Sequence, residues 1–304
     1  MKTALASAFV AFSCLGSISE AQVSFVQRAS LPSLGRWGAF TFEIDGYGYV
    51  AGGNAGGGYF SDVWRYDPVN DAWTQVASMP EGRSHGASWS VNGKGYVVCG
   101  HRPGSFYSSS LWEYDPATDV WTAKAPLPGD ARYGPYGFSI GGYGYVGGGN
   151  IGSASGPFLA DLWKYDPLND QWPSTNGIPG QERYGPTGFV IGPKAYIHGG
   201  REASMDFTTD LWEFDPTDQS WRSVQSMPGP GRSWMMVMPF DNDAVVAGGA
   251  ENGVITYEAY NYVPTQDIWE QIPDYPGESG WSGASFRLAG RPFGGLGWTI
   301  SPND

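Results

Sequence analysis

The sequence is poor in cysteine, in histidine and in basic residues. It has 2 Cys and 3 His among 304 residues, and its 17 Lys and Arg against 30 Asp and Glu give a formal net charge of −13. Such an acidic excess disfavours nucleic acid and anionic membrane surfaces as partners. Two cysteines cannot form a disulfide framework, and the histidines lack the spacing of metal ligands. We therefore expect no cofactor and no metal.

The chain also lacks the sequence signatures of common enzyme classes. It has no Ser-His-Asp arrangement, no phosphate-binding loop and no dinucleotide fingerprint. Long amphipathic patterns typical of helices are absent, whereas aromatic residues make up 15% of the chain and glycine is abundant, with 46 residues. This composition favours an all-β fold with many tight turns.

The N-terminus resembles a secretory signal. Lys2 precedes a mostly apolar or small segment, residues 4–18, and Ser19-Glu20-Ala21 fits a cleavage site, so residues 1–21 are expected to be a signal peptide and residues 22–304 a single domain. No other segment approaches the roughly 20 apolar residues of a membrane span. We expect a secreted or periplasmic monomer in which Cys99, a buried strand thiol, is the remaining cysteine.

A repeat of 48 to 51 residues runs through most of the chain. Its tryptophans fall at positions 73, 121, 172, 221 and 269, and four copies read almost alike, as in SDVWRYDPVNDAW and ADLWKYDPLNDQW. Each unit contains four strand signals separated by tight turns such as Asp45-Gly46 and the Asp-Pro turn at 67–70. Four short antiparallel strands per repeat are typical of a propeller blade.

The spacing of a double glycine, an aromatic residue and a tryptophan resembles that of the Kelch family. The double glycines lie at 52–53, 148–149, 199–200, 248–249 and 294–295. The resemblance covers about residues 23–304 and implies a Kelch-type β-propeller. It does not fix the function, because Kelch propellers include binding scaffolds, sugar mutarotases and copper oxidases.

The repeat count predicts six four-stranded blades. One period before Trp73 lies Phe25, and the C-terminal stretch from Trp298 matches a third strand and its turn. We therefore expect three C-terminal strands and one N-terminal strand to complete the last blade and close the ring (3+1). The regularly spaced tryptophans are expected to pack between neighbouring blades.

Candidate binding residues lie on the face where loop lengths vary, near the mouth of the central channel. The residues that begin the innermost strands, or lie close to that point, are Arg36, Arg83, Arg132, Arg183, Arg232, Trp37, His85, Tyr133, Tyr184, Trp234 and Trp281. The arginines permit two interpretations: they bond loop carbonyls and carboxylates of the blades, or they form an anion-binding rim. The nearby loops add aromatic residues that contact a sugar or a protein, or fold back over the blades, namely Tyr59, Phe60, Phe106, Tyr107, Phe158 and Phe207.

These observations favour an exported binding module for an anionic glycan or protein ligand. The alternative is a carbohydrate-active enzyme such as a sialic-acid mutarotase, for which Glu202, Glu251, Glu278 and His85 are the candidate proton shuttles. A galactose-oxidase-like copper enzyme is disfavoured, because two His, two Tyr and a cross-linking Cys do not recur in the required pattern.

Overall fold

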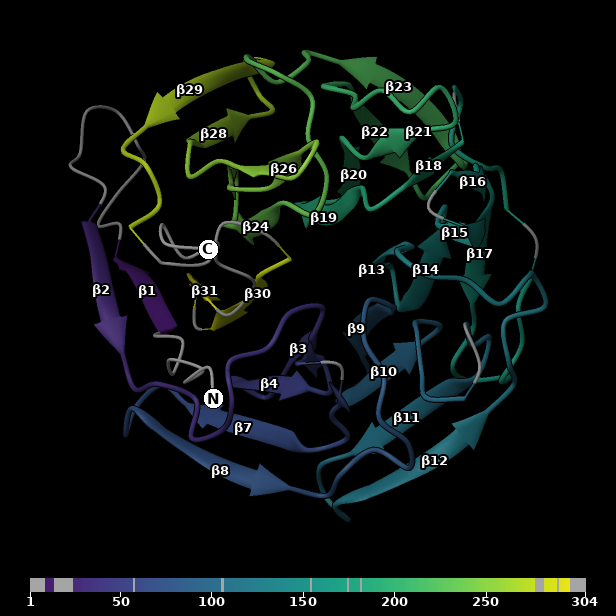
Figure 1. Ribbon diagram of the computed structural model, residues 1–304, viewed down its shortest axis with the longest axis vertical. Helices are drawn as coiled ribbons and strands as arrows, with labels where there is room; N and C mark the ends of the chain where they lie inside the picture. The colour runs from purple at the N-terminus through teal and green to yellow at the C-terminus, as the bar shows by residue number, and fades with distance from the viewer. Residues whose placement is uncertain are drawn as a thin grey trace.

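The chain forms a β-propeller, in which radial antiparallel sheets surround a central axis (Figure 1). The structure, a computed structural model, describes residues 9–13, 24–56, 58–104, 107–153, 155–173, 175–180, 182–276, 282–288 and 290–295. Every regular element in these ranges is a β strand. The all-β expectation is thus confirmed.

The radial sheets follow the sequence repeat. The first unit contains β3 (Phe40–Ile44), β4 (Tyr47–Ala51), β7 (Val63–Asp67) and β8 (Ala72–Val76). The second contains β9 (Ala87–Val91), β10 (Lys94–Val98), β11 (Leu111–Asp115) and β12 (Val120–Lys124). The third contains β13 (Tyr136–Ile140), β14 (Tyr143–Gly147) and β17 (Leu162–Tyr165). The fourth contains β19 (Thr187–Ile191), β20 (Lys194–His198), β22 (Leu211–Asp215) and β23 (Ser220–Val224). The fifth contains β24 (Met236–Pro239), β25 (Ala244–Ala247), β28 (Ala259–Val263) and β29 (Ile268–Ile272).

The third unit departs from the predicted four-strand pattern. Among the described residues, five sheets have four strands, and the sheet β13-β14-β17 has three. Outer pairing in this unit is reduced to a single bridge between Asp166 and Gln171. Pro173 follows closely, and proline cannot donate to a strand ladder. The prediction of six complete four-stranded blades is therefore wrong for this unit, and five complete blades are described.

The sheet that joins the chain ends also differs from the prediction. Its order is β2-β1-β31-β30, with β30 (Ala284–Leu288) and β31 (Arg291–Gly295) next to β1 (Phe9–Ser13) and β2 (Ser24–Arg28). Among the described residues, two strands thus come from each end instead of the predicted three and one. The apolar β1 pairs with both β31 and β2, although it lies within the expected signal. The predicted third strand from Trp298 lies outside the described residues.

Neighbouring units are joined by a repeated polar contact at the outer strands. The Trp73 indole donates to the Ala29 carbonyl at 2.8 Å, while Asp71 accepts from the Ala29 amide at 2.9 Å and from the Tyr66 hydroxyl at 2.7 Å. We call this triad the outer clasp; it recurs in the second, third and fifth units. In the fourth unit, Phe214 and Gln219 replace the tyrosine and the aspartate.

The core lies between adjacent sheets. Phe42 of the first unit stacks on Tyr49 and contacts Trp121 of the second unit edge-on, with ring centroids 6.5 Å apart. The same arrangement places Trp172 against Trp89 of the preceding unit. These contacts confirm that the regular tryptophans pack between blades.

Candidate functional site

A circle of six backbone hydrogen bonds surrounds the central axis. We call it the channel ring; each member's amide donates to the carbonyl of the next, in the order Gly38, Ser282, Trp234, Gly185, Gly134, His85 and back to Gly38. The bonds are 2.8 to 3.3 Å long. All six residues have a positive φ, between 53° and 67°. A non-glycine residue rarely adopts this conformation, so His85 and Trp234 are held there by their surroundings.

The side chains of His85 and Trp234 lie across this ring. Their rings make an edge contact with centroids 5.0 Å apart. A Cβ atom placed on Gly38 would lie 2.3 Å from the His85 ring, and one on Gly134 would lie 2.7 Å from the Trp234 ring. Glycine at these positions therefore leaves the space that the two large rings occupy.

Further aromatic rings extend from this pair as a row of nearly parallel side chains. Tyr133 stacks on Tyr107 and on Tyr184, with centroids 5.9 Å apart in both cases, and Tyr184 stacks on Phe158 at 5.2 Å. The interplanar angles are 26° to 29°. Phe158 is buried, whereas the three tyrosines are partly exposed. We call these four residues the aromatic row.

His101 joins this cluster from the second unit. Its ring contacts Tyr107 and Tyr133, and its Nδ1 atom is hydrogen-bonded to the Tyr59 hydroxyl. Desolvation lowers the pKa of His101 below its usual value. For His85, which is 8% exposed, desolvation and then the neighbouring His101 lower the pKa to about 3, so the imidazole is neutral at pH 7. Desolvation raises the pKa of Tyr133, which keeps its hydroxyl protonated as a hydrogen-bond donor.

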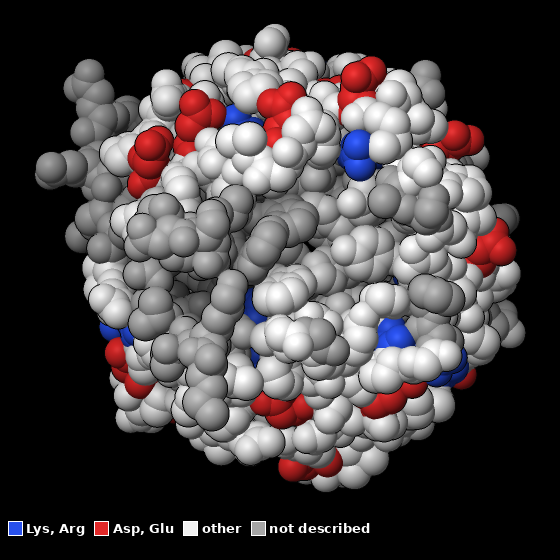
Figure 2. All heavy atoms as spheres, in the orientation of Figure 1, with Lys and Arg blue, Asp and Glu red and all other residues white. Residues whose placement is uncertain are grey.

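Short two-stranded sheets carry three residues of this cluster: Tyr59 lies in β6, Phe158 in β16 and Tyr184 in β18. The sheets are β5 (Asn54–Ala55) with β6 (Gly58–Tyr59), β15 (Asn150–Ser153) with β16 (Gly156–Phe158), and β18 (Arg183–Tyr184) with β21 (Arg201–Glu202); the fifth unit adds the hairpin of β26 (Ala250–Glu251) with β27 (Val254–Ile255). In Figure 1 the hairpin that contains β26 lies in front of the radial sheets. On the face drawn in Figure 2, acidic side chains gather around the rim, while neutral residues form most of the described centre.

The five repeated arginines lie inside the units. Four form ion pairs with a carboxylate of their own unit, at 2.5 to 2.7 Å: Arg36 with Asp62, Arg132 with Asp161, Arg183 with Asp210 and Arg232 with Glu258. With Arg83, their side chains are 0 to 2% exposed. The guanidinium groups thus have almost no surface for a ligand. Of the two interpretations, this geometry supports the one in which they close the blades.

The carboxylate partner also fixes the neighbouring tryptophan. Asp161 accepts from the Arg132 guanidinium and from the Trp163 indole, the latter at 2.6 Å. For the equivalent Asp62, burial acts to raise the pKa, but the bonds from Arg36 and Trp64 outweigh it and lower the pKa. One partly exposed carboxylate therefore satisfies both donors.

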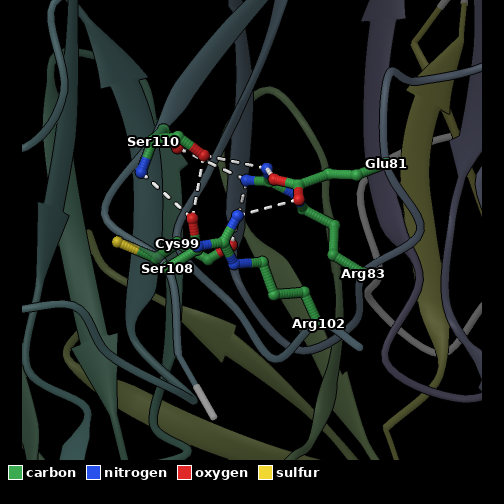
Figure 3. A network of polar contacts seen from close by, with 6 residues as sticks. All are labelled: Glu81, Arg83, Cys99, Arg102, Ser108 and Ser110. Carbon is green, nitrogen blue, oxygen red and sulfur yellow. Dashed lines mark hydrogen bonds and ion pairs between the residues drawn. The ribbon is translucent and has the colours of Figure 1, made fainter. Parts of the chain in front are cut away.

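The second unit replaces this carboxylate with Ser110 (Figure 3). Arg83 instead pairs with Glu81, which also binds Arg102 at 2.9 Å. The Ser110 hydroxyl accepts from Arg83 at 2.8 Å, but the Trp112 indole N–H is buried without a hydrogen-bond partner. Arg102, at 36% side-chain exposure, is thus the accessible cation of this network.

Below the channel ring, the innermost strands line an open pocket of about 370 Å³. Two hydroxyl groups there donate to carbonyls of the preceding unit: Ser88 to Thr41 at 2.9 Å and Ser285 to Val237 at 2.6 Å. In the part of the chain that the structure describes, no group of three or more His, Cys, Asp or Glu side chains is placed to hold a metal ion. Nor does that part contain a helix long and apolar enough to cross a membrane.

Known proteins share the repeat and the architecture. Kelch motif models match residues 43–80 and 182–228, and a second model matches residues 82–128. The chain is a β-propeller that contains Kelch motifs. A 55-residue stretch is 40% identical to an F-box/kelch-repeat protein of Arabidopsis thaliana, covering 18% of this chain and 12% of that protein. The chain thus matches only a small part of that relative's length.

A solved structure extends the similarity to most of the propeller. The structure of YjhT matches with a TM-score of 0.73, covering 88% of this chain and 91% of that chain. The sequence identity is 17%, so this likeness shows the fold alone.

The Kelch propeller brings together part of the predicted site. His85, Tyr133, Tyr184 and Trp234 form one cluster with Tyr107 and Phe158. Trp37 lies beside the channel ring, in a bridge with Asn54, and Trp281 lies outside the described residues. His101 was not among the predicted site residues. The sequence feature that could have identified it is its position directly after Cys99-Gly100, because other units have Asn54 and Asn150 directly after their double glycines.

The candidate proton shuttles of the enzyme alternative are spread over the propeller. Glu202 lies in β21 and Glu251 in β26, in the fourth and fifth units, and Glu278 lies outside the described residues. Desolvation raises the pKa of Glu202. His85 is closed off beneath its aromatic neighbours.

Proposed function

We propose that this Kelch propeller is an exported binding module that recognises a protein or glycan ligand at the mouth of its channel. The observation that carries the proposal is the aromatic cluster, in which Tyr133, Tyr184 and Trp234 from three units meet above the channel ring. Tyrosine and tryptophan offer large contact areas with little loss of rotamer freedom, and they dominate binding energies at many interfaces.

Two features support binding on this face. The cluster is anchored from below by the channel ring, so the rings are held in place before a ligand arrives, which lowers the entropic cost of binding. Its edges are carried by short two-stranded sheets of differing sequence, as is typical of recognition loops on a rigid scaffold.

The proposed anionic character of the ligand now depends on fewer residues. The five repeated arginines are buried in ion pairs, so it rests on Arg102 and Arg201 of the neighbouring loops. The cluster itself contains no Lys, Arg, Asp or Glu, and desolvation lowers the pKa of both His85 and His101, which favours their neutral forms. A largely neutral contact surface fits the geometry better.

The test is a glycan array combined with a displayed peptide library, probed with the wild-type protein and two variants. Tyr184→Ala removes a partly exposed ring from the cluster, and Tyr143→Ala removes one from the start of β14, under Lys164. We expect Tyr184→Ala to weaken binding about tenfold and Tyr143→Ala to leave it unchanged. Equal binding by both variants would refute the proposed site.

The same samples test the enzyme alternative. Wild-type protein that accelerates the anomerisation of sialic acid, followed by NMR, would favour a mutarotase over a binding module. Loss of that activity in Glu202→Gln would assign the proton shuttle. We expect no acceleration.

We further propose that the exported chain closes its ring with six blade units after removal of residues 1–21. The stretch Trp298-Thr299-Ile300-Ser301-Pro302 follows the pattern Trp64-Arg65-Tyr66-Asp67-Pro68 of the third strand in the first unit. It is suited to the position between β31 and β2 that β1 occupies here. The test is hydrogen exchange at the backbone amides of residues 296–301 in the protein that lacks residues 1–21. Rapid exchange there would contradict this closure.

A further inference from the structure

We propose that the second unit binds a chloride ion at the position where the other four arginine-containing units have a carboxylate. Those units have Asp62, Asp161, Asp210 and Glu258 there, and the second unit has Ser110. The groups that would hold the ion are the Arg83 guanidinium, the Trp112 indole and the hydroxyls of Ser108 and Ser110. All of these except Trp112 are drawn in Figure 3. Binding there does not depend on the proposed function of the channel face.

The donors of the second unit lie where the other units place theirs. Arg83 Nη1 donates to the carbonyl of the residue 16 positions later at 3.3 Å, and the other four repeated arginines do the same at 2.9 to 3.4 Å. Trp112 pairs with β10 in the same register as the tryptophans of the first, third and fourth units. In those three units the indole N–H donates to the aspartate at 2.6 to 2.7 Å. The second unit therefore keeps the donors and replaces their shared acceptor.

Two donors of this site have no acceptor in the part of the chain that the structure describes. The Trp112 indole N–H is buried without a hydrogen-bond partner. The hydroxyls of Ser108 and Ser110 bond each other at 2.8 Å, so whichever one donates, the hydrogen of the other is left over. An anion needs donors alone, whereas a water molecule also needs acceptors for its own hydrogens.

A single carboxylate serves two cations beside this position. Glu81 forms an ion pair with Arg83 through one oxygen and binds Arg102 through the other at 2.9 Å. The Arg83 side chain is 0% exposed, and desolvation lowers its pKa despite the nearby Glu81. A second negative charge beside the guanidinium would therefore be favourable.

Small side chains make room for the ion. Ser110 lacks the two carboxylate oxygens of the aspartate that it replaces. Ser108, which is buried, stands where the first unit has Phe60. The Phe60 ring covers the Arg36 guanidinium with 4.2 Å between them, and a serine cannot cover Arg83 in this way. A monatomic anion therefore suits the position better than sulfate or phosphate.

The experiment compares thermal unfolding in sodium chloride and in sodium gluconate at equal ionic strength. Gluconate is too large for a buried site, so the difference reports binding of chloride to the folded protein. We expect the wild-type protein to melt about 2 °C higher in chloride. Ser110→Asp supplies the carboxylate of the other units, so this variant should melt at the same temperature in both salts.

Ala117→Asp is the matched control. It adds the same charge at an exposed turn of the same unit and leaves the donors unchanged, so it should keep the full response to chloride. Equal responses in the wild-type protein and in Ser110→Asp would overturn the inference, because chloride would then act elsewhere. Loss of the response in Ala117→Asp would overturn it as well, since overall charge would then explain the effect.

Crystals of the wild-type protein grown in bromide give a direct measurement that needs no variant. Bromide replaces chloride and scatters anomalously. We expect an anomalous peak within hydrogen-bond reach of Trp112 Nε1 and the Arg83 guanidinium. Peaks confined to exposed surface residues would indicate an adventitious ion only and would refute the site.

Discussion

At the scale of single residues, the repeats of this chain provide internal controls. Asp161 satisfies a buried arginine and an indole N–H together, whereas the second unit has Ser110 in that place and leaves Trp112 unpaired. A buried donor without an acceptor costs about 1 to 3 kcal/mol. The difference predicts opposite effects for exchanging the two residues.

Asp161→Ser should lower the free energy of unfolding by about 2 kcal/mol, because the buried Arg132 loses its partly exposed carboxylate partner. Ser110→Asp should raise it by about 1 kcal/mol by giving Trp112 an acceptor. Urea denaturation of the three proteins measures both changes. A loss of stability in Ser110→Asp would show that Glu81 already completes this site.

A second residue-scale prediction concerns pH. His198 is fully buried, with its Nδ1 atom 2.9 Å from the Asp210 carbonyl oxygen, and desolvation lowers its pKa to about 4. Its pKa in the unfolded chain is about 6.5, so the unfolded state binds the proton first as the pH falls. Stability is therefore complete above about pH 6.5 and decreases toward pH 4.

We expect His198 to account for about 2 kcal/mol of lost stability between pH 7 and pH 4.5. His198→Gln should flatten the pH dependence in that range, whatever its effect at pH 7. The measurement is the unfolding free energy at several pH values for both proteins. An unchanged slope would mean that His198 does not titrate as described.

At the scale of elements, the sequence predicted the inner three strands of each complete unit, because Asp-Gly, Asn-Gly and Asp-Pro turns fix where the strands end. It did not predict the loss of the outer strand in the third unit. Pro173 lacks an N–H, and whether this disrupts the strand depends on its hydrogen-bond pairing with the neighbouring strand, which the sequence does not show. Nor did it predict β1, because a short apolar segment is typical both of a signal peptide and of a buried strand. Burial of the five arginines also depends on which carboxylate the fold brings near, which sequence spacing alone leaves open.

The N-terminal element is expected to hold the ring together. β2 pairs within the last sheet, and Ala29 directly after it is bonded by Asp71 and Trp73 of the first unit. Deleting residues 22–32 removes both connections and exposes the Trp73 ring. We expect a strongly lowered melting temperature by differential scanning calorimetry, and an unchanged one would refute this role of β2.

At the scale of the whole molecule, the channel ring connects the units to the aromatic row, which is the proposed binding face. It links one residue of every unit, and the rings of His85 and Trp234 that rest on it support the aromatic row. Gly134→Ala tests this coupling. Its φ is +67°, and the new Cβ would lie 2.7 Å from Trp234. Gly141→Ala is a matched control, since its φ is +62° and nothing lies within 4 Å of the new Cβ.

Both substitutions place alanine in a left-handed conformation, which costs about 1 to 2 kcal/mol. Gly134→Ala alone must also displace the Trp234 ring, so we expect a further loss of about 1 to 3 kcal/mol together with weaker ligand binding. Gly141→Ala should show the backbone cost and keep full affinity. Denaturation and calorimetric titration separate the two effects. If both variants lost stability equally and bound the ligand equally well, the channel ring would only hold the units together, and the position of the aromatic row would not depend on it.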